Sequence, residues 1–183
     1  MIKTSKLLKE IEGNAKEMFL PIIGRKKGKL LEALVKQYQP QRVLEIGTLV
    51  GYSAILMNQH MPKNGTITTV ESNAKAASVA KINFEKTRAK NISLIFGDAM
   101  KVIPGLSGPF DFVFLDAKKD EYYNYILLIE NKLSEDAIIV ADNIKMFEDE
   151  VRDYLEYVRE SENYKSETYD FGDDAMEVSF KFG

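Results

Sequence analysis

The stretch RVLEIGTLVGYSAIL, residues 42–56, decides the fold that we expect. It opens with a short apolar run from Val43 to Ile46, which is typical of a buried parallel strand. Two glycines follow, Gly47 and Gly51, and apolar residues then recur at helical spacing. A strand, a glycine turn and a helix form a binding turn for a nucleotide-like ligand. Glycine lets the backbone approach closely, and the helix N-terminus offers free N–H groups.

This turn lacks the dinucleotide fingerprint. Leu49 stands where the middle glycine would be, and Glu45 lies at the end of the strand. A carboxylate at that point disfavours a phosphate and favours a cationic ligand. S-adenosylmethionine, which carries an ammonium and a sulfonium, therefore suits the turn better than NAD. Taken alone, the turn is equally compatible with a plain strand-to-helix corner.

Length and composition place the chain among ordinary soluble globular proteins. It has 183 residues, 45% hydrophobic residues, no cysteine and a formal charge of −3. This length predicts a single domain over residues 1–183. We expect a cytoplasmic protein without membrane contact, because there is neither a signal-like apolar core nor a run of ~20 apolar residues. The charge gives no general basic field for nucleic acid.

Apolar patterns alternate between strand and helix along the chain, with no internal repeat or linker. We expect helices at 1–20, 30–39, 73–90, 122–133 and 147–161, and strands at 43–46, 66–71, 91–96, 110–116, 137–143, 164–171 and 176–182. This alternation predicts an α/β fold: a Rossmann-like, doubly wound, mostly parallel sheet that ends in a C-terminal antiparallel hairpin. The N-terminal helices, within residues 1–40, are expected to cover the site.

The segment Gly24-Arg-Lys-Lys-Gly28 is a basic turn with two interpretations. The favoured one is a solvated loop, since a run of charges usually is. The other is a lip of the cofactor site.

Acidic residues follow the predicted strands: Glu45, Glu71, Asp98, Asp116 and Asp142. Parallel α/β sheets bind ligands at the carboxyl ends of their strands, and an acid about 20 residues past the glycine turn is the expected partner of ribose hydroxyls. Glu71 meets that expectation. So many carboxylates at one edge would repel one another without cations among them. The alternative is that they are helix caps and loop acids.

A divalent metal ion would relieve this repulsion. Asp116, Asp142 and Asn143 offer hard oxygen ligands on neighbouring strands, which suits Mg²⁺, Mn²⁺ or Ca²⁺ and not zinc. Lys119 lies three residues after Asp116, and a lysine beside such a cluster can serve as a base. Lys118, by contrast, is expected to be a surface residue.

Several of these segments together resemble the class I, S-adenosylmethionine-dependent O-methyltransferases of the catechol and caffeoyl-CoA type. The resemblance runs from about residue 23 to the C-terminus. Its carriers are LEIGT (44–48), GYS (51–53), Glu71, GDA (97–99), FLDAKKDEY (114–122) and ADN (141–143). It implies a seven-stranded sheet in which a reversed seventh strand is inserted before the sixth.

The resemblance also implies roles for individual residues. Asp116, Asp142 and Asn143 would hold Mg²⁺ or a similar ion, and Lys119 would be the catalytic lysine that meets the substrate. Glu177 is similar to the acid that orients the second hydroxyl of a catechol. The implied cofactor contacts are Ile23, Glu45, Gly47, Ser53, Glu71, Asp98, Ala99 and Asp116.

Three departures from the family concern the substrate side. Lys118 replaces an acid, residues 144–147 lack the usual tryptophan and glycine, and the N-terminus is short, so that a substrate lid is expected to be missing. The expected activity is metal-dependent methyl transfer to a hydroxyl of a catechol-like aromatic, with a homodimer as one expected assembly. Two alternatives stay open: a tRNA hydroxyuridine O-methyltransferase, and a non-catalytic nucleotide-binding α/β domain.

Overall fold

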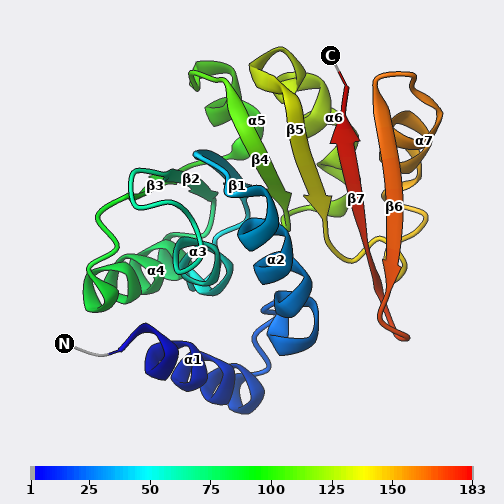
Figure 1. Cartoon of the computed structure of the whole chain (residues 1–183). Helices are drawn as coiled ribbons and strands as arrows, with labels where there is room; N and C mark the ends of the chain where they lie inside the picture. The colour runs from blue at the N-terminus through cyan, green and yellow to red at the C-terminus, as the bar shows by residue number, and fades with distance from the viewer. Residues whose placement is uncertain (1–2, 183) are drawn as a thin grey trace.

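A computed structural model describes residues 3–182 and shows a seven-stranded sheet with the order β3-β2-β1-β4-β5-β7-β6 (Figure 1). The first five strands in this order are parallel, and β7 is antiparallel to both β5 and β6. This confirms the Rossmann-like sheet and the insertion of the reversed last strand. The strands are β1 Arg42–Ile46, β2 Thr66–Glu71, β3 Ile92–Phe96, β4 Phe110–Leu115, β5 Leu133–Ala141, β6 Tyr164–Asp170 and β7 Ala175–Lys181.

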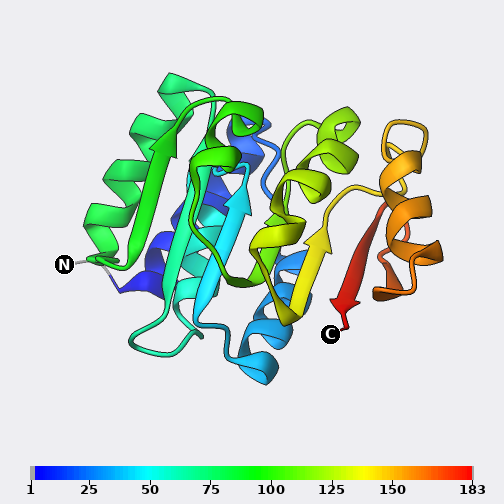
Figure 2. The same ribbon diagram turned by 90° about the horizontal axis from the view of Figure 1, so that it is seen from above.

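Helices cover both faces of the sheet (Figure 2). One face packs against α1 Thr4–Met18, α2 Gly24–Tyr38, α3 Tyr52–Asn58 and α4 Ala74–Thr87. The other packs against α5 Ala99–Val102, α6 Tyr122–Ile129 and α7 Arg152–Glu160. Because side chains alternate along a strand, neighbours such as Val43 and Leu44 enter different cores.

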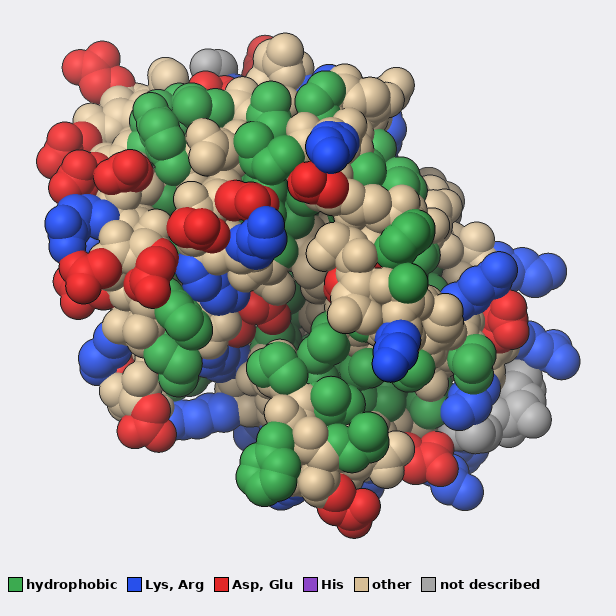
Figure 3. Space-filling view, turned by 180° about the vertical axis from the view of Figure 1, so that it is seen from behind, with side chains coloured by type: hydrophobic (Ala, Val, Ile, Leu, Met, Phe, Trp, Pro, Cys, Tyr) green, Lys and Arg blue, Asp and Glu red, His purple; other side chains and the backbone are tan. Residues whose placement is uncertain are grey.

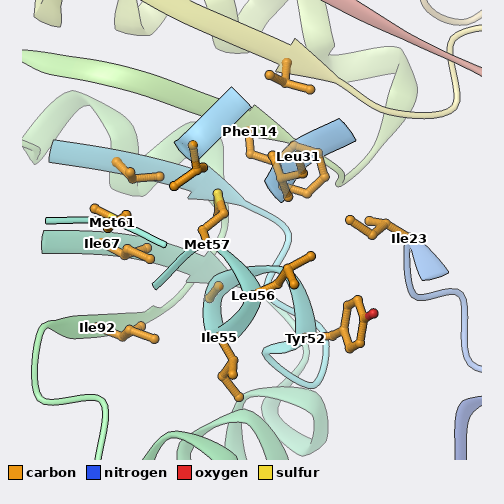
Figure 4. Packing of buried hydrophobic residues seen from close by; sticks show 14 of the residues in the cluster. Ile23, Leu31, Tyr52, Ile55, Leu56, Met57, Met61, Ile67, Ile92 and Phe114 are labelled. Atoms are coloured by element: carbon orange, nitrogen blue, oxygen red, sulfur yellow. The ribbon is translucent and has the colours of Figure 1, made fainter. Parts of the chain in front are cut away.

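The first core brings α2 and α3 onto the sheet. Leu31, Met57 and Phe114 are fully buried there, and Ile23 lies at the margin of the same cluster (Figure 4). The second core is aromatic, with the ring of Tyr122 packed edge-on against that of Tyr154. Together the two cores fix the strand ends that form the site.

Three sequence predictions were wrong at segment boundaries. The basic turn at 24–28 is the first turn of α2 and not a loop, because Gly24, at φ +67°, turns the chain into a run of good helix formers. Residues 133–136, although mostly polar, belong to β5, since Leu133 pairs with Phe110. The last long helix begins at Arg152, after a series of turns.

Among residues 3–182, no helix is both long enough and apolar enough to cross a bilayer.

Candidate cofactor and metal site

A cavity of about 520 Å³ lies at the carboxyl ends of the parallel strands. The ends of β1 and β2, with the segments that follow β3, β4 and β5, form most of its wall. Seven of the predicted site residues line it: Gly47, Glu71, Asp98, Ala99, Asp116, Lys119 and Asn143. A larger, more open groove of about 890 Å³ lies between α4 and β3, but none of the predicted site residues lines it. The cavity at the strand ends is therefore the candidate site.

The glycine turn after β1 is shaped by close backbone contacts. A Cβ atom on Gly47, which has φ +103°, would lie 2.1 Å from the carbonyl oxygen of Asp116. One on Gly51, with φ +82°, would lie 2.5 Å from the ring of Phe84. Leu49 also adopts a left-handed conformation, with φ +47°, which a non-glycine residue seldom does. Glycine at position 47 thus lets the ends of β1 and β4 approach each other at the cavity, and glycine at position 51 leaves room for the Phe84 ring of α4.

Two of the predicted acids combine a structural role with a place in the cavity wall. Glu71 accepts hydrogen bonds of 2.7 Å from the backbone N–H groups of Leu49 and Asn73. Asp98 caps α5 by accepting from the N–H of Met100 at 3.0 Å. The capping and the ligand-binding interpretations of these acids are therefore compatible, since carboxylate oxygens have further acceptor sites facing the cavity.

Three predicted cofactor contacts lie behind the cavity wall. Ile23 belongs to the core, and Glu45 is fully buried with its carboxylate accepting hydrogen bonds from Ser53 and Thr69. Burial raises the pKa of Glu45 to about 7, although these two hydroxyls oppose the shift. Direct contact of Ile23, Glu45 or Ser53 with a cofactor stays a prediction that this geometry does not favour.

The buried Glu45 makes a prediction about stability. Its pKa is raised above its ordinary value of 4.5, so the folded chain binds the proton more tightly than the unfolded chain does. Stability should therefore fall as the pH rises from about 4.5 through 7, by about 3 kcal/mol in total. Glu45→Gln should lose this dependence and be the more stable protein above neutral pH.

Urea unfolding at about pH 5 and pH 8 measures this effect. The exposed Glu135 on β5 provides the control, because Glu135→Gln should track the wild type at both values. A difference between Glu45→Gln and the wild type that did not change with pH would contradict the expected protonation of Glu45.

Beside the cavity, two acids are paired with two lysines. Asp116 Oδ1 accepts from Lys119 Nζ at 2.9 Å, and Asp142 Oδ1 accepts from Lys27 Nζ at 2.6 Å. Burial raises the pKa of Asp116 against the pull of Lys119, and burial raises that of Asp142 against the pull of Lys27. Asn143 follows at φ +62°, a left-handed conformation that asparagine tolerates. The predicted metal ligands are thus brought to one end of the sheet.

The donor chemistry of these residues fits a hard divalent cation. Two carboxylates and one amide oxygen are the ligands that such ions prefer, and another positive charge would stabilise the ionised acids. Within residues 3–182, no three His, Cys, Asp or Glu side chains are grouped so that they could share one ion. The proposed set of metal ligands therefore needs the amide oxygen of Asn143 as its third member.

Lys119 is held in a defined position. It stands at the start of a short 3₁₀ turn, Lys119–Glu121, and its Nζ donates to the hydroxyl of Tyr122 at 2.7 Å. Tyr122 is fully buried and donates in turn to the carbonyl oxygen of Leu115 at 2.9 Å. Lys118, as expected, is exposed and pairs with Glu121 at the surface.

Two residues of this cluster, Lys27 and Asp174, were not predicted from the sequence, and Glu177 lies elsewhere than the sequence predicts. Lys27 and Asp174 form an ion pair of 2.5 Å beside Asp142, although the first belonged to the presumed basic loop and the second to a hairpin turn. Nothing in the sequence around either residue indicates that its side chain contacts Asp142. Glu177 does not line the cavity: its carboxylate accepts from Arg159 of α7 and from Thr168.

A strand, a glycine turn and a helix that open on a cavity at the carboxyl ends of a parallel sheet define a nucleotide-cofactor-binding α/β protein. A family model described as O-methyltransferase matches residues 2–164. The chain belongs to this family.

Among curated proteins, the chain is 37% identical over 122 residues to a catechol O-methyltransferase of Niastella koreensis, covering 64% of this chain and 55% of that protein. It is 31% identical over 156 residues to that of Mus musculus, covering 80% and 58%. The chain thus spans little more than half the length of these relatives. Among solved structures, the O-methyltransferase TomG of Streptomyces achromogenes in complex with SAM superposes with a TM-score of 0.88 at 25% identity, over 96% of this chain and 89% of that one.

Proposed function

We propose that this chain transfers a methyl group from S-adenosylmethionine to a hydroxyl of a catechol-like small molecule, with the help of a divalent metal ion. One observation carries the proposal: Asp116 lines the cavity beside the glycine turn, pairs with Lys119, and belongs to the same cluster as Asp142 and Asn143. Asp116 would thus both contact the cofactor and bind the metal ion. The names of the relatives support the same reaction class.

The cofactor would occupy the cavity along the strand ends. Glu71 would accept from the ribose hydroxyls, and Gly47 would leave room for the amino-acid part of the cofactor. Asp98 and Ala99 would flank the adenine side. This arrangement would leave the sulfonium methyl on the side of the cavity where Asp116 and Lys119 lie.

Asp116, Asp142 and Asn143 would hold the metal ion. When bound, such an ion acts as a Lewis acid that lowers the pKa of an acceptor hydroxyl. The hydrogen bonds from Lys119 and Lys27 fix the two carboxylates before any ligand arrives. This is preorganisation of the kind that positions reacting groups.

Lys119 would accept the proton of the acceptor hydroxyl at Nζ. The freed oxygen would then take up the methyl carbon, and the electron pair of the broken carbon–sulfur bond would return to sulfur, so that S-adenosylhomocysteine is the second product. Tyr122 holds Nζ at the cavity wall during this step. A buried hydroxyl that is itself anchored to the Leu115 carbonyl makes this orientation rigid.

A large nucleic-acid acceptor is not part of the proposal. The chain carries a formal charge of −3. On the face seen from behind, acidic side chains are prominent on the side of β6 and α7, and the surface is hollowed near its centre (Figure 3). A phosphate backbone is held mainly by basic side chains, which do not dominate this face.

Methyl transfer to a panel of acceptors tests the proposed substrate class. Catechol should be methylated on one oxygen, and phenol, which has only one hydroxyl to offer, should react about 100-fold more slowly. A tRNA transcript provides the third arm. Equal rates with phenol and catechol, or methylation of tRNA alone, would refute a catechol-like acceptor.

A further inference from the structure

We propose that Lys27 and Asp174 are a positioning pair, which restricts Asp142 to a single metal-binding oxygen and turns the oxygen of Asn143 toward the metal. The site would consequently select Mg²⁺ or Mn²⁺ over Ca²⁺. This inference rests on the proposed metal-dependent function. Neither residue would touch the ion, the cofactor or the acceptor.

The pair joins three distant parts of the chain. Lys27 projects from α2, Asp142 follows β5, and Asp174 lies in the turn between β6 and β7. The Nζ of Lys27 lies 2.6 Å from Asp142 Oδ1 and 2.5 Å from Asp174 Oδ2. The three side chains are only 13%, 2% and 6% exposed. Water therefore screens this ion pair little, and the ammonium has a fixed place.

The two oxygens of Asp142 have different partners. Oδ1 accepts from both Lys27 Nζ and the backbone N–H of Asn143, the latter at 2.8 Å. Oδ2 accepts no hydrogen bond from the residues that the structure describes. Among those residues, Lys119 is the only cation within 4.0 Å of Asp116, whereas Lys27 bonds to Asp142 and Asp174. Oδ2 of Asp142 is thus the oxygen that is available to an ion shared with Asp116.

Asp174 fixes the amide of Asn143 in the same way. Its Oδ2 accepts from Asn143 Nδ2 at 2.6 Å, and its Oδ1 accepts from the backbone N–H of Met146 at 3.0 Å. A carboxylate that is bonded to an ammonium and a backbone N–H acts only as an acceptor, so the amide must turn its nitrogen toward it. The oxygen of Asn143 then points away from Asp174 and is free to bind an ion.

This arrangement has a consequence for the choice of metal. With Oδ1 of Asp142 taken by two donors, and Oδ1 of Asp116 taken by Lys119, each acid offers one oxygen. Mg²⁺ takes six ligands in a strict octahedron and commonly binds carboxylates through one oxygen. Ca²⁺ takes six to eight oxygens and often binds a carboxylate through both. Single-oxygen donors thus favour the smaller ion.

Calorimetric titration of the full chain with Mg²⁺ and, separately, Ca²⁺ tests the pair, with S-adenosylhomocysteine present and no acceptor. The variants are Lys27→Met, Asp174→Asn and the conservative Lys27→Arg. Lys26→Met is the matched control, because Lys26 is adjacent on α2 but bonds only to the Phe171 carbonyl at the surface. The measured quantity is the ratio of the Ca²⁺ affinity to the Mg²⁺ affinity. Both ions are divalent, so the change in charge that a substitution causes beside the site affects the two affinities equally and cancels in the ratio.

We expect this ratio to rise about 10- to 100-fold in Lys27→Met and in Asp174→Asn, the range typical when an outer partner of a metal ligand is removed. Lys27→Arg should restore most of the selectivity, and Lys26→Met should equal the wild type. If Lys27→Met fails to fold, Asp174→Asn, which keeps the size and shape of the side chain, gives the same answer. An unchanged ratio in a folded variant, with Mg²⁺ still bound by the wild type, would overturn the pair alone. Absence of Mg²⁺ binding by the wild type would overturn the proposed metal function itself.

Discussion

Replacing Lys119 with alanine should lower kcat 10²- to 10⁴-fold while leaving the affinity for S-adenosylhomocysteine nearly intact. Lys119 Nζ lies 2.9 Å from Asp116 and 2.7 Å from the Tyr122 hydroxyl, and its side chain is only 12% exposed at the cavity wall. A base so placed acts on the acceptor proton and contributes little to holding the cofactor. Single-turnover kinetics and calorimetry separate these two effects.

Lys118→Ala is the matched control for that variant. Its side chain is 68% exposed and pairs only with Glu121, an interaction worth little at a surface. It should keep nearly full activity. Both variants should be assayed above neutral pH, because Asp116 loses its counter-ion in Lys119→Ala and would take up a proton more readily. Equal losses in the two variants would remove Lys119 from its proposed role.

The second large effect concerns Asp142. Asp142→Ala should be inactive even in excess Mg²⁺, because it removes one of the two buried carboxylates of the proposed ligand set. It should still bind S-adenosylhomocysteine, since Asp142 does not line the cavity. Asp136→Ala, at the exposed start of the same strand, controls for general damage to β5. Wild-type activity in Asp142→Ala would refute the metal assignment.

Much of the sheet could be predicted because its strands carry their own signal. Apolar runs such as Phe110 to Leu115 are buried on both faces, and such runs leave few alternatives to a parallel strand. The position of β7 between β5 and β6 is not visible in any local pattern and came from the family resemblance. The polar start of β5 was missed because pairing between Leu133 and Phe110 outweighs the low strand propensity of residues 134–136.

The site could be predicted only where topology fixes it. Acids that end parallel strands must meet at one edge, and this placed Asp116, Asp142 and Glu71 correctly at that edge. The contacts of Lys27 span 115 and 147 positions along the chain, and nothing in a run of basic residues shows which one will turn inward.

Glu177 illustrates the opposite case. Its neighbours Met176 and Val178 enter the core beneath α2 and α3, so strand alternation turns Glu177 toward Arg159 on α7. The family resemblance suggested a substrate role for this acid. In the structure its carboxylate accepts a hydrogen bond from Arg159, and contact of Glu177 with a substrate stays a prediction.

Metal removal tests the proposed mechanism most directly. The wild-type chain should be assayed for methyl transfer to catechol in excess chelator and again after addition of Mg²⁺ or Mn²⁺, with the metal content of each sample measured. We predict loss of activity with the chelator, full recovery with either ion, and unchanged binding of S-adenosylhomocysteine throughout. Full activity in a sample shown to be free of metal would contradict the proposed mechanism and place this chain among metal-independent methyltransferases.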